Sequence, residues 1–410
     1  MQSELPRGWT LQRAGAFLSG SQIPGSTGLT AEKLTVKLYG RGVFAKQDRT
    51  PGSKNTKYFT RRKGQFIYSK LDFLNGAFGI VPPELDGRES TGDLPAFDIA
   101  QDVSPAWLLY YVSRPDFYER QGTSAIGSRK ARRVSPMEFL QLELPTPPLA
   151  EQKKIAAILS SVDEAIQTTQ AVIEQTRRVK EGLLQQLLVE GLRHGQTVKG
   201  PHGENPAVWD VVPLGVVSSL VTKGTTPPKG TMRRAGQVPY LRVGNLTFSG
   251  RLDLSDLLFI DRSIHEGVLK RSRAVPGDVL TNIVGPPLGQ VALVDERFTE
   301  WNMNQAIAIF RSDKTRLMPE FLALFLQWSM AQWWLLNRAK QTSGQVNLTL
   351  ELCRELPLPL PELAEQREIV EHVAAVDAVL QRSKLAARQL VAAKAGLLQV
   401  LLTGTVRVSP

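Results

Sequence analysis

The sequence contains one cysteine, Cys353, and four histidines among 410 residues. A single thiol excludes a disulfide within the chain, and this is typical of a protein from a reducing cytosol. The histidines show no metal-ligand spacing with the cysteine, so we expect no bound zinc or other metal. The four histidines are His194, His202, His265 and His372.

Motifs that carry out catalysis are also missing. No Gly-Lys pair occurs, which excludes a phosphate-binding Walker loop. The string that comes closest to an amino-methyltransferase motif is Gly-Pro-Pro-Leu at Gly285–Leu288, which lacks the polar and aromatic outer residues, and we interpret it as a turn. Asp116 and Glu119 faintly resemble a nuclease metal site, but their spacing is too tight. We therefore expect no catalytic residues and no cofactor in this chain.

Long hydrophobic runs are absent as well. The most apolar run, Phe321–Leu336, is interrupted by Gln327 and Gln332. It is shorter than the roughly twenty residues that cross a membrane, so we interpret it as a buried helix. The residues after Met1 do not form a cleavable leader pattern. These features lead us to expect a cytoplasmic protein with no membrane partner.

Positive charge is abundant. The chain has 50 Lys and Arg against 39 Asp and Glu, a net charge of +11, and 42% of its residues are hydrophobic. A basic surface concentrates near phosphates, so the charge indicates a polyanionic partner, although solubility alone is the alternative. The length indicates two or three domains with ordinary cores.

One segment occurs twice. Residues 142–155 and 356–369 both combine a proline-rich stretch with Leu-Ala-Glu-Gln, and Glu151 and Glu365 lie 214 positions apart. The same offset, without a gap, relates Val162–Asp163 to Val376–Asp377, Gly182–Gln185 to Gly396–Gln399, and Leu187–Leu188 to Leu401–Leu402. A proline-rich segment followed by one long helix is therefore duplicated.

Apolar residues in both copies recur at helical spacings of three, four and their sums. They are Ile155, Leu159, Val162, Ile166, Ile173, Leu183 and Leu187, and their counterparts Ile369, Val373, Val376, Leu380, Ala387, Leu397 and Leu401. A helix of about forty residues is roughly 60 Å long, and it needs a partner along its length. We expect the two helices to pair as an antiparallel coiled coil with a more polar middle, because the second domain lies between them in sequence.

The segments before the helices share an order of elements but little residue identity. Each begins at a tryptophan, Trp9 or Trp209, continues with short strands and ends with one apolar helix, Pro105–Phe117 or Pro319–Leu336. The predicted strands are Lys33–Tyr39, Gln65–Tyr68, Val238–Val243, Val279–Ile283, Gln290–Val294 and Ala306–Phe310. The predicted domains are a first head (1–143), a first spacer helix (144–196), a second head (197–355) and a second spacer helix (356–410).

Two unlike heads, each followed by Pro-x-x-Leu-Ala-Glu-Gln and a long helix, resemble the specificity subunit of type I restriction–modification systems. The motif stands at Pro147–Gln152 and Pro361–Gln366, and the resemblance covers essentially the whole chain. In the second head Leu241–Asn245 and Gly344–Leu348 look like recurrent blocks of the family's target-recognition domains. The first head departs from this pattern, because Leu38–Gly42 lacks the asparagine.

The resemblance implies an α+β fold in which two target-recognition domains are separated by two antiparallel helices, with pseudo-two-fold symmetry. It implies a non-catalytic subunit that reads an asymmetric bipartite DNA site. It also implies two modification subunits, which bring S-adenosylmethionine, and restriction subunits, which bring ATP and Mg²⁺. Two alternatives stay open: a coiled-coil scaffold whose heads bind protein, and a self-contained DNA nuclease or methyltransferase.

Two kinds of residue are candidates for DNA contact. Lys and Arg neutralise phosphates without reading sequence, whereas Arg, Asn and Gln read base edges. The predicted phosphate contacts are Lys54, Lys57, Arg61, Arg62, Lys63, Arg129, Lys130, Arg132, Arg133, Lys223, Lys229, Arg233 and Arg234. The predicted base readers are Arg242, Asn245, Gln345 and Asn347, and for the two asparagines turn or cap chemistry is an equal alternative.

Overall fold

The computed structural model describes residues 5–47, 52–120, 133–193, 195–285, 287–342 and 345–408. It divides into two compact units. Unit 1 comprises residues 1–170 and 385–410, and unit 2 comprises residues 171–384. Each unit therefore contains one head, the first part of one long helix and the last part of the other.

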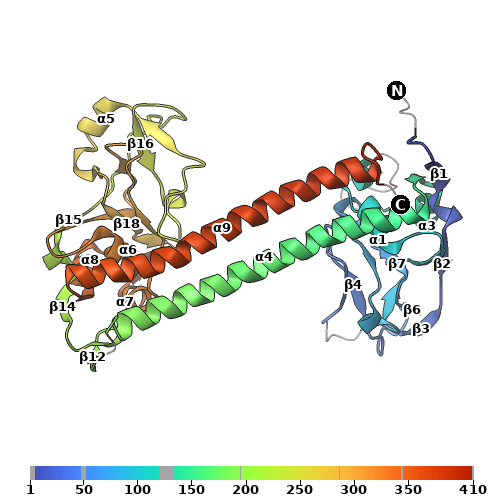
Figure 1. The fold of residues 1–410 in the computed structure, drawn as a ribbon, viewed down its shortest axis with the longest axis horizontal. Helices are drawn as coiled ribbons and strands as arrows, with labels where there is room; N and C mark the ends of the chain where they lie inside the picture. The colour runs from blue at the N-terminus through green and yellow to red at the C-terminus, as the bar shows by residue number, and fades with distance from the viewer. Residues whose placement is uncertain are drawn as a thin grey trace. The chain divides into compact units, whose positions relative to one another are not determined.

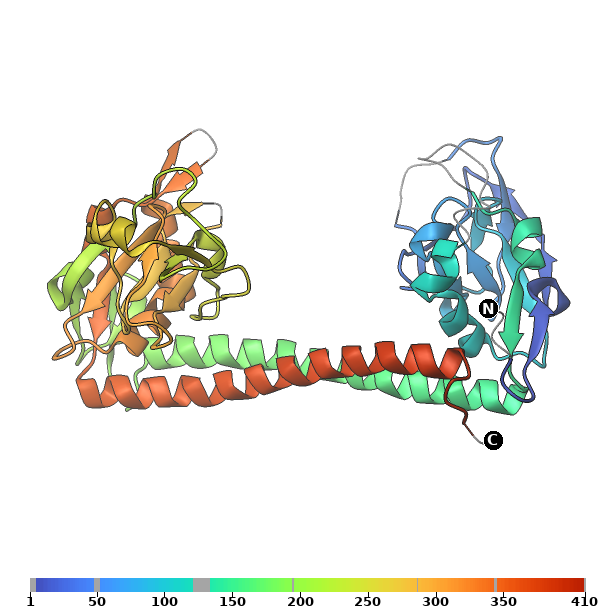
Figure 2. The same cartoon turned by 90° about the horizontal axis from the view of Figure 1, so that it is seen from above.

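The two long helices are α4 (Leu149–Val189) and α9 (Leu363–Leu402), each drawn as one uninterrupted ribbon in Figure 1. In unit 1 the start of α4 lies beside the end of α9, and in unit 2 the end of α4 lies beside the start of α9 (Figure 2). The pairing is therefore antiparallel within each unit, as predicted. The helices have 41 and 40 residues, which matches the predicted length of about forty, because the 3.6-residue periodicity of a long helix is a strong signal.

In the polar middle of the coiled coil, a lysine–aspartate ion pair joins α4 and α9 once in each unit. Lys394 Nζ lies 2.5 Å from Asp163 Oδ1 in unit 1, and Lys180 Nζ lies 2.7 Å from Asp377 Oδ2 in unit 2. The two lysines are 214 positions apart, and so are the two aspartates. A partly buried charged pair favours one register between two helices, since any other register leaves the charges unpaired.

Within the described residues, α9 is the one helix that is long and apolar enough to cross a membrane. Its residues Ile369 and Val373 are buried in the core of unit 2, and its charged residues Asp377 and Lys394 pair with α4. These contacts are those of a helix packed against protein.

Head 1 is built on a four-stranded antiparallel sheet in the order β2-β10-β7-β8. Phe139 of α3 (Pro136–Gln141) packs against the sheet, with its ring centroid 5.0 Å from that of Tyr68 and 5.5 Å from that of Phe66. The strands of head 1 are β1 (Thr10–Arg13), β2 (Leu18–Ser21), β3 (Pro24–Thr27), β4 (Leu34–Val36), β5 (Val43–Ala45), β6 (Lys57–Thr60), β7 (Phe66–Tyr68), β8 (Phe78–Ile80), β9 (Glu89–Thr91), β10 (Ala96–Ile99) and β11 (Glu143–Thr146). Strands β3, β6 and β9 form a second sheet, and β4 pairs with β5.

The predicted single helix Pro105–Phe117 is wrong. The structure has α1 (Pro105–Val112) and a short α2 (Pro115–Tyr118), followed later by α3 (Pro136–Gln141). Arg114 between α1 and α2 has an extended backbone, φ −70° and ψ 131°. A residue before proline avoids the helical region because it clashes with the proline ring, so Pro115 ends α1.

Head 2 also has a four-stranded antiparallel sheet, in the order β15-β22-β18-β20, and α6 packs on it. Its strands are β12 (Thr197–Gly200), β13 (Gly203–Pro206), β14 (Asp210–Pro213), β15 (Ser218–Lys223), β16 (Val238–Leu241), β17 (Leu258–Ile260), β18 (Val279–Asn282), β19 (Val284–Gly285), β20 (Val291–Leu293), β21 (Asn302–Met303), β22 (Ile307–Ser312), β23 (Lys340–Thr342), β24 (Gln345–Asn347) and β25 (Pro357–Leu360). Its helices are α5 (Arg262–Glu266), α6 (Pro319–Gln327), α7 (Ser329–Arg338) and α8 (Leu350–Glu355). Smaller sheets are β17-β16-β21, in which β16 and β21 are parallel, and β19-β24-β23.

The predicted helix Pro319–Leu336 is likewise two helices, α6 and α7. Trp328 separates them with an extended backbone, φ −66° and ψ 132°. Its ring is buried, and its Nε1–H donates to Gln185 Oε1 of α4 at 2.7 Å. The break coincides with a contact to a distant segment, and the local pattern does not predict it.

Each head is joined to the long helices by the same neck. In unit 1, β1 pairs antiparallel with β11, and Ala14 N donates to Leu142 O at 2.8 Å. In unit 2, β14 pairs with β25, and Leu214 N donates to Leu356 O at 2.9 Å. The proline-rich segments form the second strand of both ladders, where each strand has one neighbour and a missing N–H is tolerated.

In both units the glutamate and the glutamine of the Leu-Ala-Glu-Gln motif attach the head to the long helix. The glutamates accept from the tryptophan indoles: Trp9 Nε1 to Glu151 is 3.1 Å, and Trp209 Nε1 to Glu365 is 3.0 Å. The glutamines are buried and bind backbone groups of the head and of the proline segment. The contacts that the duplicated sequence makes are therefore duplicated too.

Candidate nucleic-acid interface

The best-defined basic surface of unit 2 is the segment Lys223–Gln237, which we call the basic loop. It leaves the end of β15, where Gly224 N and Thr225 N donate to the backbone of Ile307 and Met303 at 2.9 Å. A Cβ on Gly224 would lie 2.0 Å from Asn304 O, so this close approach requires glycine. The loop is therefore anchored at its root.

The far side of the basic loop is tied to β17. Arg233 N donates to Phe259 O at 2.9 Å, and Phe259 N returns a bond to Arg233 O at 2.8 Å. From the end of β15 to the bonds with Phe259, the side chains of Lys223, Lys229 and Arg233 are exposed. Among the described residues no ion pair involves these three cations, so their charges are available to a phosphate backbone.

Arg234 and Arg242 are held by one carboxylate. Arg234 Nη1 lies 2.6 Å from Asp256 Oδ1, and Arg242 Nη2 lies 2.6 Å from Asp256 Oδ2 and 2.7 Å from Asp256 O. The Arg242 guanidinium is the main cause that lowers the pKa of the Asp256 carboxyl, with a further contribution from Arg234. Asp256 therefore stays charged and orients both guanidinium groups. Asp256 is not predictable from the sequence, because nothing in its spacing relates it to either arginine.

The prediction that Asn245 reads a base is wrong. Its side chain is 2% exposed; Oδ1 accepts from Arg242 N and Nδ2 donates to Asp253 O, both at 2.8 Å. The residue closes the short turn after β16, which is the cap chemistry that asparagine favours.

The remaining predicted base readers lie on β24. Asn347 pairs through its backbone with β19 and β23 and is half-buried. The side chain of Gln345 lies outside the described residues. No contact with DNA is tested for either residue, and both stay predictions.

In unit 1 the predicted cluster separates into exposed and buried members. Lys54, Lys57, Arg62 and Lys63 are exposed, in or beside β6 and its following turn. Arg133 Nη1 lies 3.9 Å from Asp93 Oδ1, and both side chains are exposed to solvent. Arg129, Lys130 and Arg132 lie outside the described residues.

Arg61 corrects the prediction for this cluster. Its side chain is 1% exposed, and its guanidinium donates to Ser90 Oγ at 2.7 Å, Ser21 O at 3.0 Å and Leu94 O at 2.9 Å. Burial lowers the pKa of Arg61 to about 10. A guanidinium whose donors bind the protein interior cannot contact a phosphate, so Arg61 is a structural residue of head 1.

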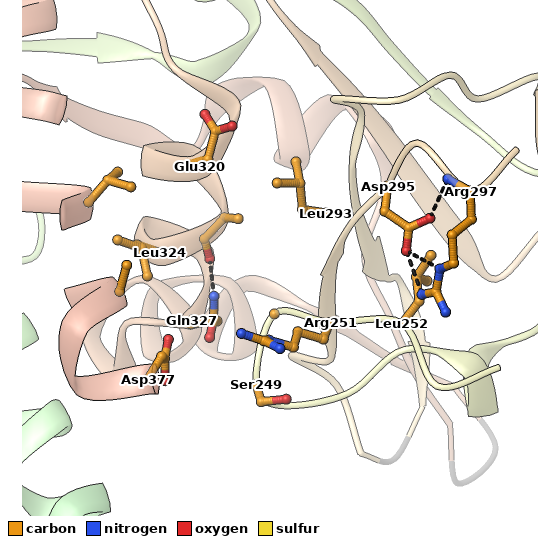
Figure 3. Close-up of a pocket in the computed structure, with 14 residues that line it drawn as sticks. Ser249, Arg251, Leu252, Leu293, Asp295, Arg297, Glu320, Leu324, Gln327 and Asp377 are labelled. Atoms are coloured by element: carbon orange, nitrogen blue, oxygen red, sulfur yellow. Dashed lines mark hydrogen bonds and ion pairs between the residues drawn. The ribbon is translucent and has the colours of Figure 1, made fainter. Parts of the chain in front are cut away.

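A pocket of about 490 Å³ in unit 2 lies between the segment Ser249–Leu252, β20, α6 and α9 (Figure 3). Its charged groups are partly satisfied within the protein: Asp295 pairs with Arg297 at 2.5 Å, and Asp377 pairs with Lys180. Figure 3 shows Arg251 and Gln327 facing the same end of the cavity. The pocket holds no nucleophile paired with a general base.

Groups suited to catalysis are scarce in the described part of the chain. No cluster of three or more His, Cys, Asp or Glu there could hold a metal ion. Burial raises the pKa of the Cys353 thiol to about 12, so the thiol is protonated and unreactive.

Comparison with known proteins agrees with the geometry. The family model of the type I restriction modification DNA specificity domain matches residues 109–177 and 206–387, more than half of the chain. A putative type I restriction enzyme MjaX specificity subunit from Methanocaldococcus jannaschii is 26% identical over 75% of this chain and 69% of its own length. The EcoBI specificity subunit from Escherichia coli is 27% identical over 56% of this chain and 50% of its own length.

Solved structures share the fold. A chain from a structure describing assembly and conformational transition of the type I R-M system has a TM-score of 0.60 and 18% identity, and the match covers 98% of this chain and 100% of that chain. The type I restriction-modification S subunit from M. genitalium has a TM-score of 0.57 and 15% identity, with 98% of this chain and 97% of that chain covered. The duplicated neck, the antiparallel helices and the family match agree, and the chain belongs to the type I restriction–modification DNA specificity subunits.

Proposed function

We propose that this subunit reads an asymmetric bipartite DNA site, with one half read by each head, and that it performs no chemistry itself. We call the two necks and the two long helices the frame. The observation that supports the proposal most directly is the contrast between this frame, which repeats, and the heads, which differ. The neck, the tryptophan–glutamate bond and the lysine–aspartate pair occur in both units with nearly equal distances. The two heads differ in their small sheets and in their basic residues. Equal frames carrying unequal heads fit a site whose halves differ.

We further propose that partner subunits in the cytoplasm supply the reactive groups. The neck, the tryptophan–glutamate bond and the lysine–aspartate pair each occur twice, which fits two modification subunits that carry S-adenosylmethionine. Restriction subunits would bring ATP and Mg²⁺.

Methylome sequencing tests the bipartite site. A host that expresses this chain with its modification partner is expected to carry methylated adenines in one motif made of two unlike segments separated by a fixed number of unread positions. The matched control is the same host with the partner alone, which should show no such motif. A single contiguous motif, or methyl transfer by this chain without a partner, would contradict the proposal.

The basic loop is expected to contact phosphates. Replacing Lys223, Lys229 and Arg233 by glutamine should weaken DNA binding and lower the salt slope of log K by about 2–3, because each lost phosphate contact removes roughly 0.9 from the slope. Fluorescence anisotropy of labelled duplex across a range of salt concentrations measures both quantities.

The control for the basic loop has the same change in net charge. Arg177, Arg262 and Arg297 already pair with carboxylates on the protein surface. Their replacement by glutamine should leave the salt slope nearly unchanged. Equal slopes for the two triple variants would show that total charge, and not the loop, determines the affinity.

A further inference from the structure

One residue of head 1 holds a backbone conformation that its side chain disfavours. Tyr39 has φ +57°, and it is the one non-glycine residue with a positive φ in the part of the chain that the structure describes. In this region the Cβ of an L-residue crowds the following carbonyl oxygen, so glycine is the usual residue there. The side chain of Tyr39 is 65% exposed. The conformation therefore costs free energy that burial of the ring does little to offset.

Tyr39 stands at the tip of the hairpin formed by β4 and β5. Arg41 N donates to Leu38 O at 3.3 Å, and the two central residues of this turn, Tyr39 and Gly40, have φ +57° and +65°. Positive values at both central positions are those of a type I′ turn, which favours asparagine, aspartate or glycine at the first of them. The turn would therefore form more easily with another residue at position 39, and the tyrosine has to be explained by its ring.

The tip of this hairpin is tied to the rest of head 1. Tyr39 N donates to Asn75 O at 2.9 Å, and Gly40 N donates to Gly76 O at 2.8 Å. The inward-facing residues of β4 and β5 are buried in a hydrophobic core of the head. The hairpin therefore presents the ring at a fixed place. Backbone strain that the surrounding structure holds in this way is typical of binding and catalytic sites.

The surroundings of the ring are basic. Lys37 and Arg41 are exposed on either side of Tyr39 in the sequence, and no ion pair among the described residues involves them. Residues 37–46 contain three Lys and Arg and no Asp or Glu. An exposed aromatic ring between two cations fits a nucleic acid, because the cations bind phosphates while the ring stacks on a base.

We propose that Tyr39 inserts its ring at a base step of the half-site that head 1 reads, while Lys37 and Arg41 bind the flanking phosphates. This inference rests on the proposed function and deepens it. Side chains inserted between base pairs unstack the step and kink the duplex. Pyrimidine–purine steps unstack most easily, so the ring is expected to enter at such a step. Tyr39 then selects DNA by its deformability, without a hydrogen bond to a base.

Two substitutions separate the effect of the ring from that of the backbone. Tyr39→Asn removes the ring and creates the favoured Asn-Gly turn, so the amides of β4 and β5 should exchange with solvent as slowly as before or more slowly. Tyr39→Phe keeps the ring. The matched control is Phe44→Thr, which removes an exposed ring from β5 of the same hairpin.

The kink is measured on the complex of the full chain with its modification partner. The probe is an end-labelled duplex that carries the methylated motif, and energy transfer between its ends reports the bend. Tyr39→Asn is expected to reduce the bend by about 20° or more, whereas Tyr39→Phe and Phe44→Thr should keep it. Affinity for the duplex should fall about tenfold in Tyr39→Asn, because one base–aromatic stack is lost.

Duplexes with one mismatched pair, placed at each pyrimidine–purine step of the motif in turn, give an independent measurement. A mismatch lowers the cost of unstacking, so the unaltered complex should bind one of these duplexes about tenfold more tightly than the matched duplex. Tyr39→Asn should bind both equally.

Three results would overturn the proposal: an unchanged bend in Tyr39→Asn, an equal preference for the mismatch in both proteins, or loss of the modification partner in Tyr39→Asn, which would make the ring a protein contact. None of them affects the bipartite site, because methylome sequencing tests that site with the unaltered chain. A contiguous motif would contradict the proposed function instead.

Discussion

Exchanging residues 14–142 for the corresponding segment of another family member is expected to replace one half of the methylated DNA motif and leave the other half unchanged. The expected effect is complete, because the head would carry all the base contacts for its half. The neck explains why the change should be limited to one half of the motif. The ladder of β1 with β11, the bond from Trp9 to Glu151 and the bond from Gln152 to Pro147 O stay native in such a hybrid, so the attachment of the neck to the helix is kept.

The exchange points lie where the chain enters and leaves the head. Ala14 N and Leu142 O are hydrogen-bonded to one another, so a grafted head begins and ends at neighbouring positions. Methylome sequencing of a host with the hybrid and its modification partner gives the motif directly. The reciprocal exchange of residues 214–356, which lies between Leu214 and Leu356 of the second neck, should change the other half. A hybrid that changed both halves would show that the heads do not read independently.

The duplicated frame could be predicted from the sequence because its signals are local and repeated. The ungapped offset of 214 identifies the copies, and the three- and four-residue spacing of apolar side chains predicts a helix of about forty residues, as observed in the 41 residues of Leu149–Val189. Antiparallel pairing followed from the position of the second head between the helices. Each short predicted strand overlaps an observed one: β4 lies within Lys33–Tyr39, whereas β22 begins within Ala306–Phe310 and continues to Ser312.

The two broken helices show what a local pattern omits. Pro115 could have signalled the end of α1, because the residue before a proline disfavours helix. Trp328 carries no such signal: its extended backbone accompanies an indole bond to Gln185, which is 143 positions away in the chain. An apolar run predicts burial, but it does not say whether the helix continues through it.

The candidate site was predicted by residue type, and residue type does not reveal burial. Arg61 stands among exposed cations in the sequence, yet its guanidinium binds Ser90 and two carbonyls inside head 1. Asn245 caps a turn. Asp256 orients two arginines, and its place in the sequence does not indicate this role. Charge clusters therefore predicted the kind of partner better than the individual contacts.

The glutamine of the second Leu-Ala-Glu-Gln motif is expected to be among the most sensitive positions for stability. Gln366 is fully buried; its Oε1 accepts from Met318 N, and its Nε2 donates to Arg316 O and Pro361 O, all at 2.8 Å. Alanine would leave these three backbone groups without that partner and open a small cavity. Each unsatisfied buried group costs about 1–3 kcal/mol, so we expect unit 2 to lose roughly 3 kcal/mol or more.

Hydrogen exchange is the appropriate measurement, because a chain with two units need not unfold in one step. In Gln366→Ala, amides of α6 should exchange faster by a factor of about 100 or more, since 1.4 kcal/mol corresponds to tenfold at 25 °C. Gln366→Met fills the volume without the hydrogen bonds, and it should recover only the cavity part of the loss. Gln389→Ala, at an exposed position of the same helix, should leave exchange unchanged.

The equivalent substitution in unit 1 separates the hydrogen bonds from the motif itself. Gln152 makes two of these bonds, from Ser104 N and to Pro147 O, both at 2.8 Å. Gln152→Ala should therefore destabilise unit 1 by less than Gln366→Ala destabilises unit 2, and protection in α6 should stay intact. If both alanine variants matched Gln389→Ala, the motif would contribute little to stability, and its duplication would need another explanation. If Gln366→Ala, which loses three bonds, destabilises its unit more than Gln152→Ala, which loses two, then the motif recurs because each head needs its own attachment to the helices.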